Sequence, residues 1–217
     1  MLYEPERHRI LEMCHLLQAK EYFLGTWGNV SMRVGDHIIL TPSKLDYAVM
    51  RAEDMVVIDL DGNRIQGEQT ATSEKEVHRQ IYLVRSDVGA IIHAHTKYAM
   101  AMSVIEHAEV PCVTEEMSQL LGGAIPVTQQ YVPAEQHIEL GKAVANCIGS
   151  SNGVIIRNHG PVACGRSLEE ALLSISVIEK SCEIYAALPY GKILTLPKTA
   201  IESEHYRYFY KYGSEKT

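Results

Sequence analysis

The sequence predicts an α/β fold: a single layered domain with a central, largely antiparallel sheet flanked by helices. Short apolar runs of strand length alternate with longer segments whose apolar residues recur at helical spacing. Several neighbouring runs are joined by tight turns such as Gly35-Asp36, which predicts hairpins and argues against a doubly wound parallel sheet. The chain of 217 residues fits one domain, spanning residues 1–217.

The first half of the chain combines one hairpin with two helices. Ile10, Cys14 and Leu17 fall on one face at helical spacing, and Pro5 stands in a first turn, where proline is tolerated. Acidic residues follow Thr72 and Ser73, either of which can cap a helix. We therefore expect a helix over 4–23, strands over 30–34, 37–41 and 55–60, an exposed loop over 63–72, and a helix from Thr72 or Ser73 to about Arg85.

The second half follows the same alternation of strands and helices. Its longest predicted helix is strongly apolar on one side, and its tail is rich in tyrosine. We expect strands over 89–95, 153–157 and 161–164, helices over 97–107, 115–121, within 133–147 and over 168–188, and a tyrosine-rich tail over 198–213.

Composition excludes several classes of protein. A net charge of −7 and a pI of about 5.8 give no indication of a basic surface that would bind nucleic acid. The five cysteines are widely spaced and form no Cys-x-x-Cys, which fits reduced thiols better than a disulfide framework. The N-terminus is charged, and no apolar run approaches the ~20 residues of a membrane helix. We expect a soluble, cytoplasmic protein that binds neither nucleic acid nor membrane.

Two histidines end the predicted strand 89–95. Side chains two residues apart on a strand point to the same face, so His93 and His95 should face together. Two imidazoles on one face can share a metal ion, and imidazole suits zinc. The pair is not decisive alone, because a His-x-His is not rare in a chain with 10 histidines.

His159 is the candidate for a third imidazole ligand. It follows the predicted strand 153–157 and precedes Gly160, so it lies at a strand end. Ligands at the ends of adjacent strands can converge, and three imidazoles with an open fourth position are typical of a catalytic zinc. The alternative is a turn residue whose ring bonds the backbone.

Glu74 is the candidate acid/base. It stands near a predicted helix start, where a glutamate most often serves the helix itself. Beside a metal, the same carboxylate can deprotonate a carbon next to a carbonyl group. His78 lies one turn further on, and we interpret it as an ordinary histidine of the helix face, with orientation of Glu74 as the alternative.

Three short segments can form a phosphate cradle. They are Gly28-Asn29, the loop Thr41-Pro-Ser43-Lys44, and Thr72-Ser73, which opens a helix whose free N–H groups favour anions. Each is a weak signal alone, because serine and threonine in loops usually serve turns. None matches the Gly-x-x-x-x-Gly-Lys-Ser/Thr nucleotide loop, so ATP binding is not predicted.

Together these motifs resemble the class II aldolase/adducin family. They occur in the family's order over most of the chain, from about residue 4 to the tail. The combination is specific for the family, although no single motif is. The motifs are Gly25-Thr-x-Gly28-Asn29-Val-Ser31, Thr41-Pro-Ser43, Ser73-Glu74, His93-x-His95 and Asn158-His159-Gly160.

The resemblance implies reversible aldol cleavage of a ketose 1-phosphate, L-fuculose 1-phosphate or a related deoxy-pentulose 1-phosphate, to dihydroxyacetone phosphate and an aldehyde. It implies Zn²⁺ as cofactor, with another divalent metal such as Mn²⁺ as the alternative, and a homotetramer with shared active sites. The implied roles are zinc binding by His93, His95 and His159, acid/base catalysis by Glu74, phosphate binding by Gly28, Asn29, Ser43, Thr72 and Ser73, and protonation of the aldehyde oxygen at a neighbour's site by Tyr212.

Two positions depart from the family pattern. Lys44 stands where the aldolases usually have glycine, so it either adds a positive charge to the phosphate site or points away. Glu116 stands about where a tyrosine contacts the aldehyde half, which makes it the candidate for aldehyde specificity.

Other activities of the family remain open alternatives. Ribulose-phosphate 4-epimerases, methylthioribulose-1-phosphate dehydratases and sugar-acid phosphate decarboxylases share the metal site. A non-catalytic binding module, as in the adducin branch, is opposed by the intact histidines and Glu74. A lysine Schiff base is opposed by the lack of a lysine in an apolar strand.

Overall fold

The computed structural model describes residues 1–188 and 193–211. Within these residues the centre is a seven-stranded sheet of order β4-β3-β2-β1-β5-β9-β8, in which every neighbouring pair is antiparallel. This confirms the predicted fold class. The strands are β1 (Asn29–Val34), β2 (His37–Leu40), β3 (Val56–Asp59), β4 (Arg64–Gln66), β5 (Ala90–His93), β8 (Gly153–Ile156) and β9 (Gly160–Gly165).

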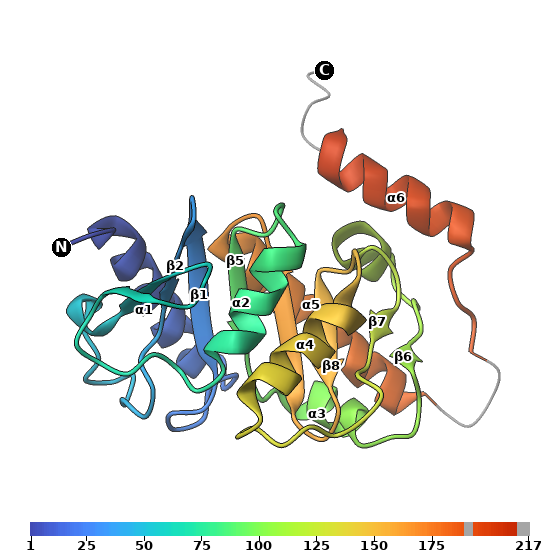
Figure 1. Cartoon of the computed structure of the whole chain (residues 1–217). Helices are drawn as coiled ribbons and strands as arrows, with labels where there is room; N and C mark the ends of the chain where they lie inside the picture. Colours follow the sequence, from blue (N-terminus) through green and yellow to red (C-terminus); the bar gives the residue numbers. More distant parts are fainter. Residues whose placement is uncertain (189–192, 212–217) are drawn as a thin grey trace.

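Helices cover both faces of this sheet (Figure 1). Helices α1, α3 and α5 pack on one face, while α2 and α4 pack on the other and against each other. The helices are α1 (Glu4–Ala19), α2 (Lys75–Val84), α3 (Lys97–Ser103), α4 (His137–Ile148), α5 (Leu168–Ala187) and α6 (Lys198–Tyr210). A 3₁₀ turn spans Ala52–Asp54, a π-helical turn spans Met117–Leu121, and a small ribbon pairs β6 (Glu109–Val110) with β7 (Ile125–Pro126).

The central strands are buried on both faces. In β5, Ala90 and Ile92 belong to the core under α1 and α5, while Ile91 belongs to the core under α2 and α4. A strand between two layers has no solvent side, so its sequence reads as one unbroken apolar run. The same burial brings the end of β5, and with it His93, deep into the molecule.

Two predicted segments differ from the structure, and the tail contains a helix that the sequence analysis did not predict. Part of the predicted loop 63–72 is the edge strand β4, whose three residues are all exposed and therefore carry no apolar signal. The tyrosine-rich tail contains a helix, α6, none of whose described residues is buried. The predicted helix 97–107 ends at Ser103, and the ring of His107 bonds the Met102 and Glu109 carbonyl oxygens instead.

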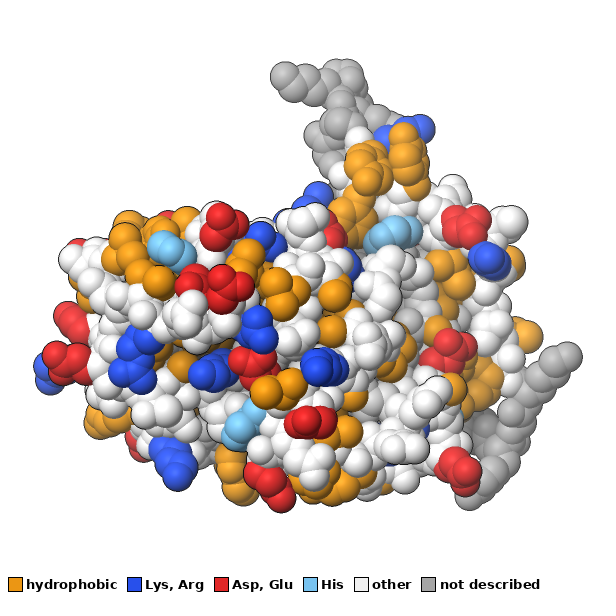
Figure 2. Space-filling view, viewed as in Figure 1, with side chains coloured by type: hydrophobic (Ala, Val, Ile, Leu, Met, Phe, Trp, Pro, Cys, Tyr) orange, Lys and Arg blue, Asp and Glu red, His pale blue; other side chains and the backbone are white. Residues whose placement is uncertain are grey.

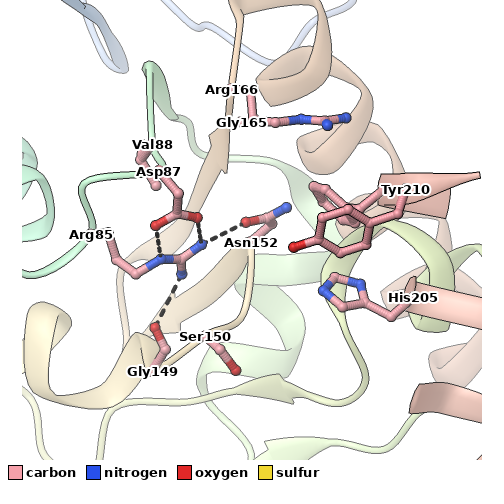
Figure 3. A pocket seen from close by; sticks show the side chains of 11 residues that line it. Arg85, Asp87, Val88, Gly149, Ser150, Asn152, Gly165, Arg166, His205 and Tyr210 are labelled. Atoms are coloured by element: carbon pink, nitrogen blue, oxygen red, sulfur yellow. Dashed lines mark hydrogen bonds and ion pairs between the residues drawn. The ribbon is translucent and has the colours of Figure 1, made fainter. Parts of the chain in front are cut away.

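A hollow of about 500 Å³ lies beneath the C-terminal end of α6 (Figure 3). Arg85 is prominent in it, but all five of its N–H donors are used within the protein. They bond both carboxylate oxygens of Asp87, the carbonyl oxygens of Gly149 and Ser151, and Oδ1 of Asn152, at 2.7–3.1 Å. Arg85 therefore joins the α2–β5 turn to the α4–β8 turn and has no donor left for a ligand.

The surface that carries α2 and α4 mixes acidic and basic side chains rather than separating them (Figure 2). Among the described residues, no helix combines the length and the apolar character needed to cross a membrane.

Candidate active site

The candidate site lies where β1 begins and β5 ends. These strands pair so that Asn29, the first residue of β1, stands opposite His93, the last residue of β5. The turn between β8 and β9 brings His159 to the same edge, and Glu74 reaches it from the residue before α2. Four segments far apart in the sequence therefore meet at one end of the sheet.

The three predicted imidazoles form one cluster. Ring centroids lie 5.1 Å apart for His93 and His95, 4.9 Å for His93 and His159, and 5.0 Å for His95 and His159. One nitrogen from each ring lies within 4.8 Å of the other two. His95 stands beyond the end of β5, yet the chain stays paired there, because the Ala94 N–H donates to the Pro161 carbonyl oxygen at 3.2 Å.

The nitrogens of this cluster have the character of metal ligands. Nδ1 of His93 donates to the Pro161 carbonyl oxygen at 2.9 Å, which leaves the lone pair of its neutral ring on Nε2. Nε2 of His93 and Nε2 of His95 are buried without a hydrogen-bond partner. Burial, followed by the neighbouring imidazoles, lowers the pKa of both rings. Neutral imidazoles are the form that binds zinc, so the residues fit a divalent metal.

Local backbone geometry explains the position of His159. Asn158 adopts the left-handed conformation with φ 55°, which asparagine tolerates better than most residues. Gly160 follows, and a Cβ there would lie 2.5 Å from the Ala94 carbonyl oxygen. Only glycine permits this approach of the β8–β9 turn to the end of β5, which brings the His159 ring against that of His95.

Glu74 lies against two of the imidazoles. Its Oε2 is 3.2 Å from Nε2 of His93, and its Oε1 is 3.1 Å from Nε2 of His159. Oε2 also accepts a hydrogen bond from Nδ2 of Asn29 at 2.7 Å, whereas Oε1 has no hydrogen-bond partner. One carboxylate oxygen is therefore fixed by a hydrogen bond, and the other has none.

The start of α2 differs from the sequence expectation. The helix begins at Lys75, so Glu74 occupies the N-cap position, where its side chain makes no capping bond. Thr72 instead accepts the Glu74 backbone N–H through Oγ1 at 3.3 Å. Neither Thr72 nor Ser73 is the cap residue, because the helix starts later and the side chain of Glu74 turns toward the histidines.

A cavity of about 380 Å³ opens in front of the cluster. Backbone bonds hold two of its walls together, from the Thr72 N–H to the Thr41 oxygen at 3.0 Å and from the Ser43 N–H to the Thr70 oxygen at 2.8 Å. Its lining combines Glu74, His95 and His159 with all the residues predicted to bind phosphate: Gly28, Asn29, Ser43, Lys44, Thr72 and Ser73.

Lys44 is exposed and has a positive φ of 60°. Glycine adopts this left-handed conformation without the steric penalty of a Cβ. This backbone conformation explains why glycine suits the position. In this chain the lysine adopts the same conformation and lines the cavity wall.

One contributor escaped the sequence analysis, and another was given the wrong role. Trp27, the chain's only tryptophan, lines the cavity with 60% of its surface exposed, and its ring lies 6.0 Å from that of His95. A large apolar residue within a glycine-rich loop was the available signal. His78 is fully buried and donates to Oδ1 of Asn29, so it is not the ordinary histidine of the helix face that we expected.

Two predicted residues are not among the described residues of this site. Glu116 forms an ion pair with Nζ of Lys180 at 2.6 Å and is not part of the cavity lining. Tyr212 lies outside the described residues. Their roles in aldehyde specificity and protonation stay predictions.

Comparison with known proteins gives consistent matches. Residues 8–186 match the model of the Class II Aldolase and Adducin N-terminal domain. An L-fuculose phosphate aldolase of Methanococcus maripaludis is 33% identical over 174 residues, which cover 80% of this chain and 92% of that protein. One of Methanocaldococcus jannaschii is 31% identical over 82% and 94% of the two chains.

Solved structures agree. An L-fuculose 1-phosphate aldolase superposes with a TM-score of 0.88 at 26% identity over 94% of this chain and 96% of that one. YgbL of Klebsiella pneumoniae, described as a putative aldolase/epimerase/decarboxylase, superposes with a TM-score of 0.82 at 25% identity over 94% and 99% of the chains.

Proposed function

Because the chain belongs to the class II aldolase and adducin family, we propose that it cleaves a ketose 1-phosphate reversibly to dihydroxyacetone phosphate and an aldehyde. Membership of this family, together with relatives and a solved structure that are fuculose phosphate aldolases, makes it an enzyme of the lyase class. We propose L-fuculose 1-phosphate or a related deoxy-pentulose 1-phosphate as substrate, a divalent metal, zinc first, as cofactor, and the cytoplasm as location.

One observation carries this proposal. Two buried imidazole nitrogens without partners, on His93 and His95, converge with that of His159 beside a carboxylate that has one free oxygen. A buried polar atom without a partner is costly, so such a cluster is expected where a ligand supplies the missing bonds.

In this proposal the three histidines hold the metal, and Glu74 moves the proton. When a divalent cation is bound, the chemistry it supplies is stabilisation of the negative charge that develops during carbon–carbon cleavage. Glu74 exchanges the proton on the dihydroxyacetone phosphate carbon that forms or breaks the bond. Its Oε1 lies 3.1 Å from Nε2 of His159 and has no hydrogen-bond partner, while Oε2 accepts a hydrogen bond from Asn29.

The phosphate is proposed to bind at the far walls of the cavity. The segment that leads into α2 presents Thr72 and Ser73, and the loop opposite presents Ser43 and Lys44. A helix N-terminus favours anions through its free N–H groups and its dipole. Lys44 adds a positive charge and is the one lysine or arginine among the described residues that line this cavity. That charge matters for an anionic ligand, because the molecule as a whole has a net charge of −7.

A homotetramer with shared active sites is the proposed assembly. Helix α6 buries none of its described residues, and Tyr206 and Tyr210 are 55% and 72% exposed. Apolar rings on an uncovered helix suit a contact with a neighbouring subunit. Tyr212 stands two residues after the last residue of α6 in the sequence and would act at the neighbour's site.

The decisive experiment is an assay of the metal-loaded protein on a panel of ketose 1-phosphates, with dihydroxyacetone phosphate as the measured product. Release of dihydroxyacetone phosphate that depends on the metal supports aldol cleavage. An inverted sugar, a dehydrated product or released carbon dioxide would instead identify an epimerase, a dehydratase or a decarboxylase.

A further inference from the structure

A row of buried polar side chains lies behind Glu74, between α2 and β1. Glu74, His78 and Tyr82 stand four residues apart, which puts them on one face of the helix. Asn29 and Ser31 stand two apart on the strand and share its face toward α2. All five are at least 92% buried, beside the apolar residues that pack between α2, α4 and the sheet.

Hydrogen bonds join these five side chains into one chain. The Tyr82 hydroxyl lies 2.8 Å from Oγ of Ser31, and that Oγ lies 2.7 Å from Nδ1 of His78. Nε2 of His78 bonds Oδ1 of Asn29, and Nδ2 of Asn29 bonds Oε2 of Glu74 at 2.7 Å.

The ionised carboxylate sets the direction of every bond. It only accepts, so the Asn29 amide must turn its N–H toward Glu74 and its Oδ1 toward His78. Nε2 of His78 must then donate, and in a neutral ring Nδ1 accepts from the Ser31 hydroxyl. Ser31 in turn accepts from Tyr82. Burial, with a smaller contribution from His93, lowers the pKa of His78 to about 3, in keeping with the neutral ring.

We propose that His78 and Ser31 are positioning residues of the reaction, which fix the Asn29 amide so that Glu74 keeps Oε2 bonded and Oε1 free. This inference rests on the proposed role of Glu74 as the base. Without the His78 donor, the Asn29 amide can reverse and present its oxygen to the carboxylate, which then loses its only hydrogen bond. The carboxylate would rotate away from the geometry that proton transfer needs.

The direct test compares Ser31→Ala and His78→Leu with the native protein. We expect each variant to keep its metal and its KM, while kcat and the exchange of the dihydroxyacetone phosphate proton with deuterated solvent fall together by roughly 10- to 100-fold. Loss of phosphate binding would raise KM instead, and loss of folded protein would lower metal content.

Conservative variants and a matched control separate positioning from stability. His78→Gln should recover part of the exchange rate, because an amide can donate to Asn29 and accept from Ser31. Ser174→Ala removes another fully buried hydroxyl, which donates to the Cys164 oxygen at 2.9 Å. We expect it to lower the melting temperature about as much as Ser31→Ala and to leave the exchange rate unchanged.

Exchange at the wild-type rate in folded, metal-loaded Ser31→Ala and His78→Leu would overturn the inference. If His78→Leu does not fold, Ser31→Ala decides, and wild-type exchange in that variant overturns the inference equally. Glu74→Gln is measured in parallel. Exchange that survives in Glu74→Gln refutes the proposed base, whereas exchange lost in Glu74→Gln but kept in the other variants refutes only the positioning role.

Discussion

Replacement of Glu74 by glutamine is the sharpest test of the proposed chemistry. Glutamine keeps the shape of the side chain and removes the base. Its oxygen can still accept from Nδ2 of Asn29, and its N–H group then points toward Nε2 of His159, where the carboxylate oxygen lies 3.1 Å away. We expect Glu74→Gln to bind metal and dihydroxyacetone phosphate without the ability to remove the proton.

The expected loss is large in rate and small in stability. Loss of a positioned base typically costs about 10²–10⁴-fold, which corresponds to about 3–5 kcal/mol of activation free energy. The Glu74 side chain is about 10% exposed and has one hydrogen bond and one unpartnered oxygen. A neutral amide is less costly to bury there, so the free energy of unfolding should change by no more than about 1 kcal/mol.

Two assays measure the effect independently. Release of dihydroxyacetone phosphate reports cleavage, and nuclear magnetic resonance in deuterated solvent reports exchange of the ligand's proton. Glu76→Gln is the matched control, because the Glu76 side chain is likewise 10% exposed and the residue lies two positions further on. Its carboxylate pairs with Arg79 at 2.8 Å, so this variant should lose stability and retain exchange. Wild-type exchange in Glu74→Gln would show that another group is the base.

Four further outcomes are expected. The double variant His93→Ala, His95→Ala should lose its bound metal in elemental analysis, and full retention would refute the site. Ser73→Ala should raise KM for phosphorylated sugars about 10-fold, and equal activity on unphosphorylated sugars would refute the phosphate cradle. The pKa of His78 is lowered to about 3 in the folded protein, so the unfolded chain binds a proton at a higher pH than the folded one. The free energy of unfolding of the metal-free protein, measured by chemical denaturation, should therefore fall as the pH is lowered from about 6.5 toward 3. The fall should be smaller in His78→Gln, which lacks this titrating ring. Removal of residues 205–217 should leave a folded, metal-loaded protein with impaired cleavage, and full activity as a monomer in solution scattering would contradict the shared site.

Much of the sheet was predictable because burial leaves a strong pattern in the sequence. The strand β5 is buried on both faces, so its sequence is an unbroken apolar run. The strands β1 and β2 are joined by a turn that contains a glycine at positive φ, so the hairpin was also recognisable. The strand β4 and the helix α6 were not predictable. Neither contains a buried residue, and the tyrosines of the tail recur at every second position, which is not a helical period.

The ligand segments of the site were predictable, but their arrangement was not. The motif around His93 showed that two histidines end a strand. The register that places Asn29 opposite His93 depends on strand pairing across 64 residues of sequence. The same limit hid Trp27, whose contact with the His95 ring arises only when the glycine-rich loop folds over the end of β5.

Unmet hydrogen-bonding capacity shows where the fold has been shaped for a ligand. Among the described residues, six buried side-chain atoms have no hydrogen-bond partner, and three of them are Oε1 of Glu74, Nε2 of His93 and Nε2 of His95. In the polar row behind Glu74, by contrast, the side chains of Asn29, His78 and Ser31 each have hydrogen-bond partners on both sides. Each unpartnered atom costs about 1–3 kcal/mol. A preorganised base beside a metal requires both features. The carboxylate must be held still by hydrogen bonds on one side, and the imidazole nitrogens on its other side must remain available for the metal.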